Sequence, residues 1–501
     1  MSSEKKVHIG NSIPRMILVG ISLLFQMGWI LLTILVLNES FPWIEMATRV
    51  LSVIVILGIN SKHTGAAYKM PWIMLIMAAP MMGLSLYLMM GIFGDLGSIG
   101  KRLKAVRHLT RRKLDKKISA EGICYYLQEH VNCPAYENTA VNYYSEASDA
   151  LEALKDSLEQ AESFIFMEYF IVSGDSAFQE LVDILIRKAR QGVDVRFMYD
   201  DVGSVGNVNL SFAKQLSDAG IHCVVFNPAL PLLNVFMNHR DHRKITVIDG
   251  KVGFTGGFNL SDEYFGRKIT YGRWKDTGIR LEGEAVQSLT AAFLEMWNAC
   301  TRTMENVEPY LSVVHSVPGD CLVQPYEDDP LGRERVAENV YLHLIHSARK
   351  CLYVVTPYLI ITDEMTNALG LAAKRGVDVR IITPGVPDKK VVYEVTRSYY
   401  AGLAAQGVRI FEYTPGFCHA KQMLCDGHMA SIGTSNLDYR SLYLHFENNV
   451  LLQGGKAVED MTRDFEALFP QCKEVTEGYR SGRSRALRVG QYILRLFSPL
   501  L

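Results

Sequence analysis

The sequence lacks several features that would assign it to common classes of protein. Its 52 lysine and arginine residues are balanced by 53 acidic residues, and the net charge of −1 gives none of the basic excess expected of a general nucleic-acid-binding protein. The nine cysteines are scattered, with no CxxC pair and no Cys/His spacing that indicates a zinc site. An odd, dispersed set of cysteines is typical of reduced thiols in the cytoplasm. These absences argue against a nucleic-acid partner, a metal site and a disulfide framework.

Long uncharged runs are present in the N-terminal region, residues 1–98. Met16–Leu37 is 22 residues long and Pro71–Phe93 is 23 residues long, and neither contains a charged residue. At about 1.5 Å per residue, each run is long enough to cross a hydrocarbon core of roughly 30 Å. We interpret the first run as a retained anchor rather than a signal peptide, because it is long and lacks a small-residue cleavage site. The shorter run Val50–Ile59 is either a third crossing or an interfacial helix, so we expect two or three transmembrane helices.

A basic segment, residues 99–119, follows the second run. By the positive-inside rule it lies on the cytoplasmic side of the membrane, which places the globular part there too. The segment either attracts anionic headgroups or is a solvated linker that carries only topological information. Its single acid is Asp115, and its basic residues are Lys101, Arg102, Lys104, Arg107, Arg111, Arg112, Lys113, Lys116 and Lys117.

The globular part is an α/β protein with an internal repeat. Short β-branched and aromatic runs alternate with segments of helical periodicity from about residue 120. The sequence R-Q-G-V-D-V-R at 190–196 returns as K-R-G-V-D-V-R at 374–380, and a further helix-to-strand step recurs after each copy. Two matches in the same order indicate duplication, with halves at 120–310 and 311–478. Two copies of one unit usually pack about a pseudo-twofold axis, which brings equivalent loops together.

The same short motif occurs once in each half. His242 and Lys244 are followed by Asp249, and His419 and Lys421 are followed by Asp426, so both copies fit H-x-K-x4-D. An asparagine lies 17 residues after each histidine, at Asn259 and Asn436, and an acid lies further downstream, at Glu263 and Glu447. One such motif is weak, but two copies with matching offsets inside a duplication are hard to attribute to chance.

Two imidazoles and two ammonium groups around one cavity suit a phosphodiester. Residues at i and i+2 of a strand point the same way, so each His and Lys share a face. The lysines and asparagine amides can stabilise the non-bridging oxygens as charge develops. One histidine can attack phosphorus while the other protonates the leaving oxygen. Asp249 and Asp426, further along the strand, are expected to orient and brace the site.

Paired H-x-K-x4-D motifs followed by G-G-x-N or G-T-S-N resemble the phospholipase D superfamily. Together with the hydrophobic N-terminal helices, the basic segment and the C-terminal sequence L-R-L-F-S-P-L-L, they are similar to bacterial cardiolipin synthases. The resemblance covers nearly the whole chain from about residue 47. It implies two duplicated phospholipase D-like α/β domains, each a mixed sheet flanked by helices, after N-terminal transmembrane helices. It also implies a multi-pass protein of the cell membrane.

The resemblance also implies a reaction. Phosphatidylglycerol supplies a phosphatidyl group through a phosphatidyl-histidine, glycerol leaves, and a second phosphatidylglycerol accepts the group to give cardiolipin. No metal or nucleotide cofactor is implied, because one phosphodiester replaces another of similar energy. His242 is expected as nucleophile and His419 as acid/base. A phospholipase D hydrolase, a phosphatidylserine synthase and a non-enzymatic lipid-binding protein remain alternatives.

Three strand residues and the C-terminal segment complete the candidates. Glu168, Tyr169 and Tyr358 lie on the repeated strand that would line the cavity, although buried strand aromatics are often plain core. Residues 479–501 interleave arginines with apolar residues. This pattern predicts an amphipathic helix that lies either on an anionic membrane surface or on the second domain.

Overall fold

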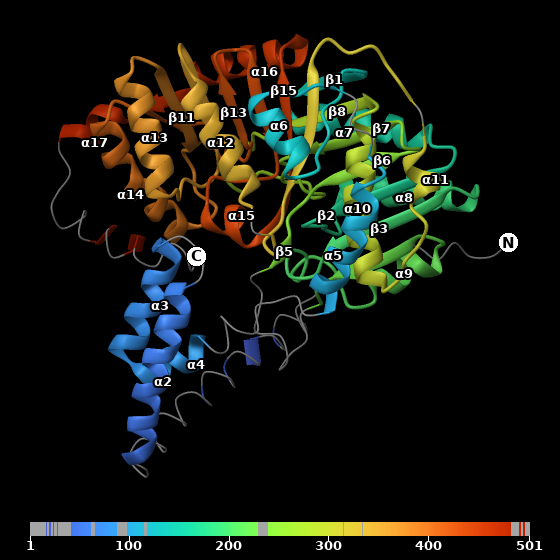
Figure 1. Cartoon of the computed structure of the whole chain (residues 1–501). Helices are drawn as coiled ribbons and strands as arrows, with labels where there is room; N and C mark the ends of the chain where they lie inside the picture. Colours follow the sequence, from blue (N-terminus) through green and yellow to red (C-terminus); the bar gives the residue numbers. More distant parts are fainter. Residues whose placement is uncertain are drawn as a thin grey trace.

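Two α/β halves, each built around one sheet, form the body of the computed structural model (Figure 1). The structure describes residues 42–61, 66–87, 98–114, 118–228, 239–313, 315–332 and 334–481, with single positions near both ends of the chain. Most of the predicted helix Met16–Leu37 and of the C-terminal segment 479–501 lies outside these residues.

The sheet of the first half has the order β1-β8-β7-β6-β2-β3-β4 in the described part of the chain. Its inner strand β2 is mostly apolar, and every residue of this strand is buried. The strands are β1 (Thr139–Tyr144), β2 (Phe164–Tyr169), β3 (Asp194–Asp200), β4 (His222–Phe226), β6 (Ile245–Ile248), β7 (Val252–Gly256) and β8 (Gly278–Gly283). The helices are α7 (Ala147–Glu159), α8 (Ser176–Arg190), α9 (Phe212–Asp218), α10 (Val286–Thr301) and α11 (Glu308–Leu311).

The second sheet repeats this order as β9-β15-β14-β13-β10-β11-β12, extended by β16 beyond β12. Its strands are β9 (Leu322–Asp328), β10 (Cys351–Val355), β11 (Asp378–Pro384), β12 (Arg409–Tyr413), β13 (Gln422–Cys425), β14 (Met429–Gly433), β15 (His445–Gln453) and β16 (Cys472–Glu474). Its helices are α12 (Val336–Ser347), α13 (Asp363–Lys374), α14 (Lys390–Ala405), α15 (Tyr439–Tyr443), α16 (Gly455–Leu468) and α17 (Thr476–Ser481).

The repeated V-D-V-R sequence explains the parallel part of each sheet. Helices α8 and α13 are each followed by a glycine in the left-handed region, Gly192 at φ +92° and Gly376 at φ +90°. Glycine adopts this conformation without a Cβ penalty, and the chain reverses directly into β3 or β11. These strands pair in parallel with β2 and β10, while the motif-bearing strands β6 and β13 pair antiparallel on the other side. The mixed sheet flanked by helices and the duplication are both confirmed.

The two halves share part of one core, so the site between them rests on a packed interface. A single cluster of buried side chains includes Phe166 and Phe293 from the first half and Phe446 and Val450 from the second. The short strand β5 (Arg240–Asp241), just before the first motif, pairs with the start of β15. Helix α6 (Gly122–Glu129), within the predicted first domain, packs in a cluster with α12 of the second half.

The basic segment preceding the first half includes a helix, α5 (Ser98–Arg111), that packs against α10 (Figure 1). Arg111 is buried and pairs with Glu295 at 2.6 Å and with Glu327. Arg107 pairs with Glu295 at 3.0 Å and with Asp329. These two arginines therefore bind protein carboxylates rather than solvent or lipid, and sequence alone gave no sign of their partners.

The N-terminal helices project from the body below the second half (Figure 1). They are α2 (Pro42–Ser61), α3 (Ala66–Ala78) and α4 (Pro80–Tyr87), so the run Pro71–Phe93 is not the single helix predicted from its length. Pro80 explains the break, because proline lacks the N–H that would continue the helix and its ring clashes with the preceding turn. Among the described residues, no helix combines the length and apolar character needed to cross a membrane.

The described positions of the C-terminal segment contact the second half. Arg495 lies 4.1 Å from the centre of the Tyr399 ring, and Leu494 packs at the edge of the second-half core. Gln491 donates a hydrogen bond to Glu394 at 3.4 Å. Of the two predicted arrangements, these contacts favour docking on the protein's own second domain.

Candidate active site

The two motif histidines line one cavity between the halves. His242 and His419 each lie three residues before a strand, β6 and β13 respectively, and both are about nine-tenths buried. The cavity has a volume of about 560 Å³. The prediction that duplicated motifs converge on one site therefore agrees with the tertiary structure.

Each histidine is held by a carboxylate from the opposite half. His242 Nδ1 lies 2.9 Å from both carboxylate oxygens of Glu447, and His419 Nδ1 lies 2.6 Å from Asp276 Oδ2. Both carboxylates are fully buried. A carboxylate at Nδ1 fixes the tautomer and leaves Nε2 as the reactive nitrogen. The crossed pairs mean that neither half contains a complete site by itself.

Backbone hydrogen bonds cross between the halves in the same way. The amide of His242 donates to the carbonyl oxygen of Phe446 at 2.9 Å, and the amide of His419 donates to that of Lys275 at 2.7 Å. Phe446 and Lys275 immediately precede the two carboxylates. The same backbone contact therefore sets the position of each imidazole and of the acid that holds it.

Sequence reasoning found Glu447 but missed its counterpart Asp276. Strand register establishes the equivalence: Gly256 pairs with Gly278 and Gly433 pairs with Asn449, and each acid lies two residues before the second member. The intervening loop is longer in the first half, which places Asp276 34 residues after its histidine against 28 for Glu447. Glu263, chosen by proximity in sequence, lines the cavity but pairs with Lys268 at 2.9 Å. A comparison of the strands, rather than of fixed offsets, would have found Asp276.

The two motif lysines are buried beside the histidines. Lys244 Nζ donates to the carbonyl oxygen of His242 at 2.6 Å, and Lys421 Nζ donates to that of His419. Burial lowers the pKa of Lys244 to about 7 and that of Lys421 to about 8, although neighbouring carboxylates act in the opposite direction. Desolvated cations at this position favour an anionic ligand such as a phosphate.

The two half-sites differ in their charge. Burial and Lys244 hold the pKa of His242 well below its ordinary value, whereas burial and Lys421 lower that of His419 to about 4 with Asp276 opposing them. Burial raises the pKa of Glu447 well above its ordinary value. Burial opposes ionisation of Asp276 too, but the charges of His419 and Lys421 outweigh it and lower the pKa. The His419 side therefore supports an imidazolium better than the His242 side.

Both predicted asparagines reach the cavity wall. Asn259 accepts a hydrogen bond from the amide of Ile171 at 3.0 Å and donates to the hydroxyl of Tyr264 at 2.9 Å. Asn436 donates to Asp438 at 3.0 Å. Because each NH2 group has two hydrogens, one N–H of each amide can still donate to a ligand.

The motif aspartates are structural and do not line the cavity. Asp249 accepts hydrogen bonds from the backbone amides of residues 162–164 at 2.7–2.8 Å, and Asp426 from those of residues 349–351 at 2.7–2.9 Å. Both adopt positive φ in the turn after the motif strand. They brace the start of β2 and β10, at the other end of these strands from the cavity, so they hold the sheets in place and do not orient the groups of the site directly.

Of the three further candidates Glu168, Tyr169 and Tyr358, one lines the cavity and two do not. Glu168 is buried against Arg243 at 2.5 Å, and the hydroxyl of Tyr169 lies 3.0 Å from that of Thr246, so neither lines the cavity. Tyr358 does line it, and its hydroxyl donates to Asp388. Glu168 and Tyr169 lie on opposite faces of β2 and neither reaches the cavity, which is lined instead by residues just beyond the strand ends, Phe170 after β2 and Tyr358 after β10.

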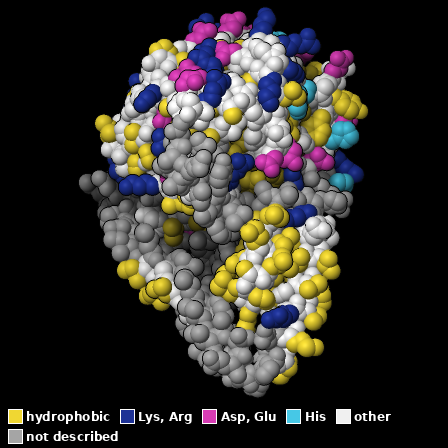
Figure 2. All heavy atoms as spheres, turned by 90° about the vertical axis from the view of Figure 1, so that its left-hand side faces the viewer, with side chains coloured by type: hydrophobic (Ala, Val, Ile, Leu, Met, Phe, Trp, Pro, Cys, Tyr) yellow, Lys and Arg dark blue, Asp and Glu magenta, His cyan; other side chains and the backbone are white. Residues whose placement is uncertain are grey.

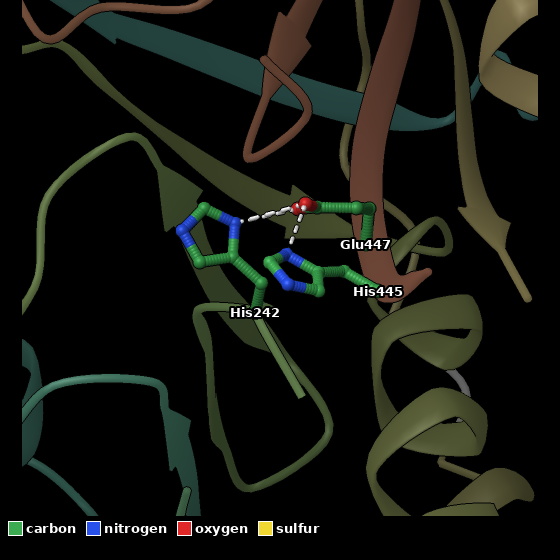
Figure 3. Close-up of side chains that lie close together, drawn as sticks. All are labelled: His242, His445 and Glu447. Carbon is green, nitrogen blue, oxygen red and sulfur yellow. Dashed lines mark hydrogen bonds and ion pairs between the residues drawn. The ribbon is translucent and has the colours of Figure 1, made fainter. Parts of the chain in front are cut away.

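Figure 3 shows His242 and His445 approaching the same carboxylate, Glu447. One ligand atom from each of these residues lies within 4.8 Å of the others, which is compatible with a metal ligand set. Burial lowers the pKa of His445, and the neighbouring cations Arg440 and Lys244 lower it further. Such a positive environment opposes a divalent cation. We therefore interpret the cluster as part of an anion-binding site.

The two walls of the cavity differ, and sequence reasoning missed most of the residues that form them. Aromatic rings of Tyr264, Trp274 and Phe417 surround His419, with ring centres at 5.1, 5.4 and 5.8 Å. His242 instead contacts Phe170 at 4.9 Å and His445 at 5.5 Å. Other cavity residues outside the motifs are Arg240, Arg440, Asp388, Lys389 and Asp438. None belongs to a repeated motif, so only the folded chain brings them together.

Comparison with known proteins agrees with this geometry. Residues 154–297 and 341–469 match a family described as "Cardiolipin synthase, PLD-like domain". A cardiolipin synthase of Halalkalibacterium halodurans is 34% identical, with 94% of this chain and 98% of the relative covered. Cardiolipin synthase 2 of Bacillus cereus is 39% identical, over 72% of this chain and 71% of the relative.

A solved structure shares the fold. The phosphatidylserine synthase of Haemophilus influenzae superimposes with a TM-score of 0.55 at 14% identity, covering 76% of this chain and all of that one. This likeness shows the fold alone, while the family match spans both motif-bearing halves. The chain belongs to the cardiolipin synthase family of proteins with phospholipase D-like domains.

Proposed function

We propose that the protein is a cardiolipin synthase that transfers a phosphatidyl group from one phosphatidylglycerol to another and releases glycerol. The observation that carries this proposal is the pair of buried histidines in one cavity, each oriented by a carboxylate from the opposite half. Two imidazoles in different electrostatic surroundings supply the nucleophile and the acid/base that phosphodiester exchange requires. Family membership supports the choice of substrate.

His242 is the proposed nucleophile. Its lowered pKa keeps the imidazole neutral, and the Nδ1–H donated to Glu447 leaves the lone pair of Nε2 for attack on phosphorus. In the first step a P–N bond forms, the bond from phosphorus to the glycerol oxygen breaks, and His419 gives its proton to that oxygen. The anionic phosphodiester favours the required imidazolium at His419, which Asp276 supports.

The second step reverses the proton transfer. His419, now neutral, takes the proton of the acceptor hydroxyl while that oxygen bonds to phosphorus. The P–N bond breaks, and His242 returns to its neutral form as cardiolipin leaves. One phosphodiester has replaced another, so atoms and charge balance within these two residues and two lipids.

The lysines and asparagines stabilise the phosphoryl oxygens in both steps. Lys244 and Lys421 are buried beside the two cavity-lining histidines, and their charge is worth more at low local dielectric than in water. The remaining N–H of Asn259 and of Asn436 can donate to the same oxygens. All four groups are held before substrate binds, so little reorganisation is needed during the reaction.

A hydrolase reaction would use the same groups with water as acceptor. The aromatic wall around His419, the acid/base, favours a lipid alcohol over water at the position where the acceptor must be deprotonated. A phosphatidylserine synthase would use serine and a nucleotide-linked donor, and the shared fold alone does not support that substrate.

The N-terminal helices are the proposed membrane attachment. Trp43, Met46, Ile54 and Leu57 of α2 are each 60–73% exposed. Figure 2 shows hydrophobic side chains gathered over this projecting part of the molecule. Exposed apolar surface of this extent is typical of a surface that is covered by lipid or protein. We propose that it associates with the membrane that supplies phosphatidylglycerol and other anionic lipid, with the catalytic halves on the cytoplasmic side.

The test is a lipid assay with phosphatidylglycerol as the only lipid substrate. Purified protein in mixed micelles is compared with His242→Ala and His419→Ala, and with His346→Ala as a control at an exposed position of α12. We expect wild type and the control to form cardiolipin and glycerol, and the two motif variants to form neither. Phosphatidic acid in place of cardiolipin would identify a hydrolase. No product would exclude phosphatidylglycerol as donor and direct the assay to a nucleotide-linked lipid.

A further inference from the structure

The cavity wall beside His242 carries three nitrogen-rich side chains that the two-step chemistry does not use. Arg240 comes from β5, Arg440 from α15 and His445 from the first position of β15, and all three line the cavity. The parallel pairing of β5 with β15 places Arg240 directly opposite His445. Three separate segments thus contribute to one patch of wall.

Both ring nitrogens of His445 are without a hydrogen bond in the described part of the chain. The residue is only 8% exposed. Its Nδ1 lies 3.6 Å from Glu447, whose carboxylate is already bonded to His242 (Figure 3). A buried polar group without a partner is costly, and such a group at a binding cavity indicates a ligand.

The arginines make this wall positive. Arg240 is held at 3.3 Å from Asp200 and donates to the carbonyl oxygen of Asn227 at 3.0 Å, but its buried Nε makes no hydrogen bond to a described residue. Burial, Arg440 and Lys244 together hold the pKa of His445 well below its ordinary value. A positive, desolvated surface of this kind suits an anion with several acceptor oxygens.

Among the described residues, the wall beside His419 has no equivalent patch. His445 lies two residues before Glu447, and the equivalent position before Asp276 is occupied by Trp274. Its ring packs against His419 at 5.4 Å. The pseudo-twofold symmetry is therefore broken at this position, with a basic group beside the imidazole of His242 and an aromatic ring beside that of His419. Any ligand that needs the basic group can bind only on the His242 side of the cavity.

We propose that Arg240, Arg440 and His445 form a subsite for the phosphodiester of the second, acceptor lipid. This inference rests on the proposed cardiolipin synthase function, in which donor and acceptor both carry a phosphate. The product has two phosphodiesters joined through one three-carbon glycerol, so the acceptor phosphate must lie close to the reacting phosphorus. The wall beside His242 and the acid/base His419 line the same cavity of about 560 Å³, so a subsite there is close enough to hold the acceptor phosphate and to select phosphate-bearing alcohols over glycerol and water.

The experiment separates acceptors with and without a phosphate. Each variant is given phosphatidylglycerol with radiolabelled glycerol, and two products are measured: cardiolipin, and phosphatidylglycerol labelled by exchange. Exchange reverses the first step and uses a neutral acceptor at the same histidines. The variants are His445→Gln, Arg440→Gln and Arg440→Lys, with His346→Gln and Arg463→Gln as surface controls.

We expect His445→Gln and Arg440→Gln to lower cardiolipin formation about tenfold or more, the effect of a lost charge-assisted hydrogen bond, while glycerol exchange stays within about threefold. Arg440→Lys should recover much of the loss, because it restores the charge. Equal loss of both products, or cardiolipin formation at the wild-type rate, would overturn the subsite. A wild type that exchanges glycerol but makes no cardiolipin would instead refute the proposed function.

Discussion

Replacement of Asp276 by asparagine tests the crossed arrangement of the active site. Asp276 is fully buried and lies 2.6 Å from Nδ1 of His419, although the two residues belong to different halves. Asparagine preserves the shape but removes the charge that stabilises the imidazolium. A hydrogen bond to a charged group contributes about 1.5–3 kcal/mol, which corresponds to a fall in kcat of about 10- to 150-fold.

The pH dependence of this variant gives a second measure. Asp276 raises the pKa of His419 against burial and Lys421, so its loss lowers that pKa. A general acid is fully protonated below its pKa and loses its proton as the pH rises. The descending limb of the kcat profile should therefore move to lower pH in Asp276→Asn.

The assay is cardiolipin formation from phosphatidylglycerol in mixed micelles across a pH series, with thermal unfolding to check that the variant is folded. Asp378→Asn, which alters an acid paired with Arg380 at a distant strand, is the matched control. A folded Asp276→Asn enzyme with kcat within twofold of wild type and an unchanged pH profile would refute the crossed-pair reasoning.

Three further predictions follow from the same geometry. Glu447→Gln should slow the first release of glycerol at least about tenfold, seen in a rapid-quench burst, because His242 loses its orienting partner; a normal burst would contradict this. Asp249→Asn should lower the free energy of unfolding by about 1–3 kcal/mol, since asparagine tolerates the positive φ but accepts the three amide hydrogen bonds less well. Its kcat should equal that of wild type at temperatures below the unfolding transition. Asp426→Asn should lower the free energy of unfolding by a smaller amount, because Asp426 is more exposed. Lys244→Met and Lys421→Met should abolish turnover without lowering the melting temperature, since each removes a desolvated charge; full activity in either variant would exclude the two-motif site. In wild type, kcat/KM should fall as the pH rises through about 7 to 8, where these lysines lose the charge that binds phosphate.

The sequence by itself was sufficient for the duplication, the α/β class and the two motifs. The reason is that these features are local or repeat at constant offsets: the V-D-V-R joins, H-x-K-x4-D and the asparagine 17 residues on. The family resemblance drawn from the same residues agrees with the comparisons.

The membrane region shows where local reasoning failed. Hydropathy and run length predicted one helix over Pro71–Phe93, but Pro80 ends α3 and starts α4. Likewise, Arg107 and Arg111 looked like solvent-facing basic residues, whereas carboxylates from α10 and β9 bind them. Composition cannot reveal a partner that is nearly 200 residues away in sequence.

Only the tertiary structure decided which residues complete the site. Asp276 and Glu447 are equivalent by strand register but not by sequence offset, because the loop before Asp276 is longer. Arg240, Arg440 and His445 meet because β5 of the first half pairs with β15 of the second. Sequence order determines what each half can form alone, whereas the chemistry depends on contacts between the halves, which follow from how two sheets pack and pair.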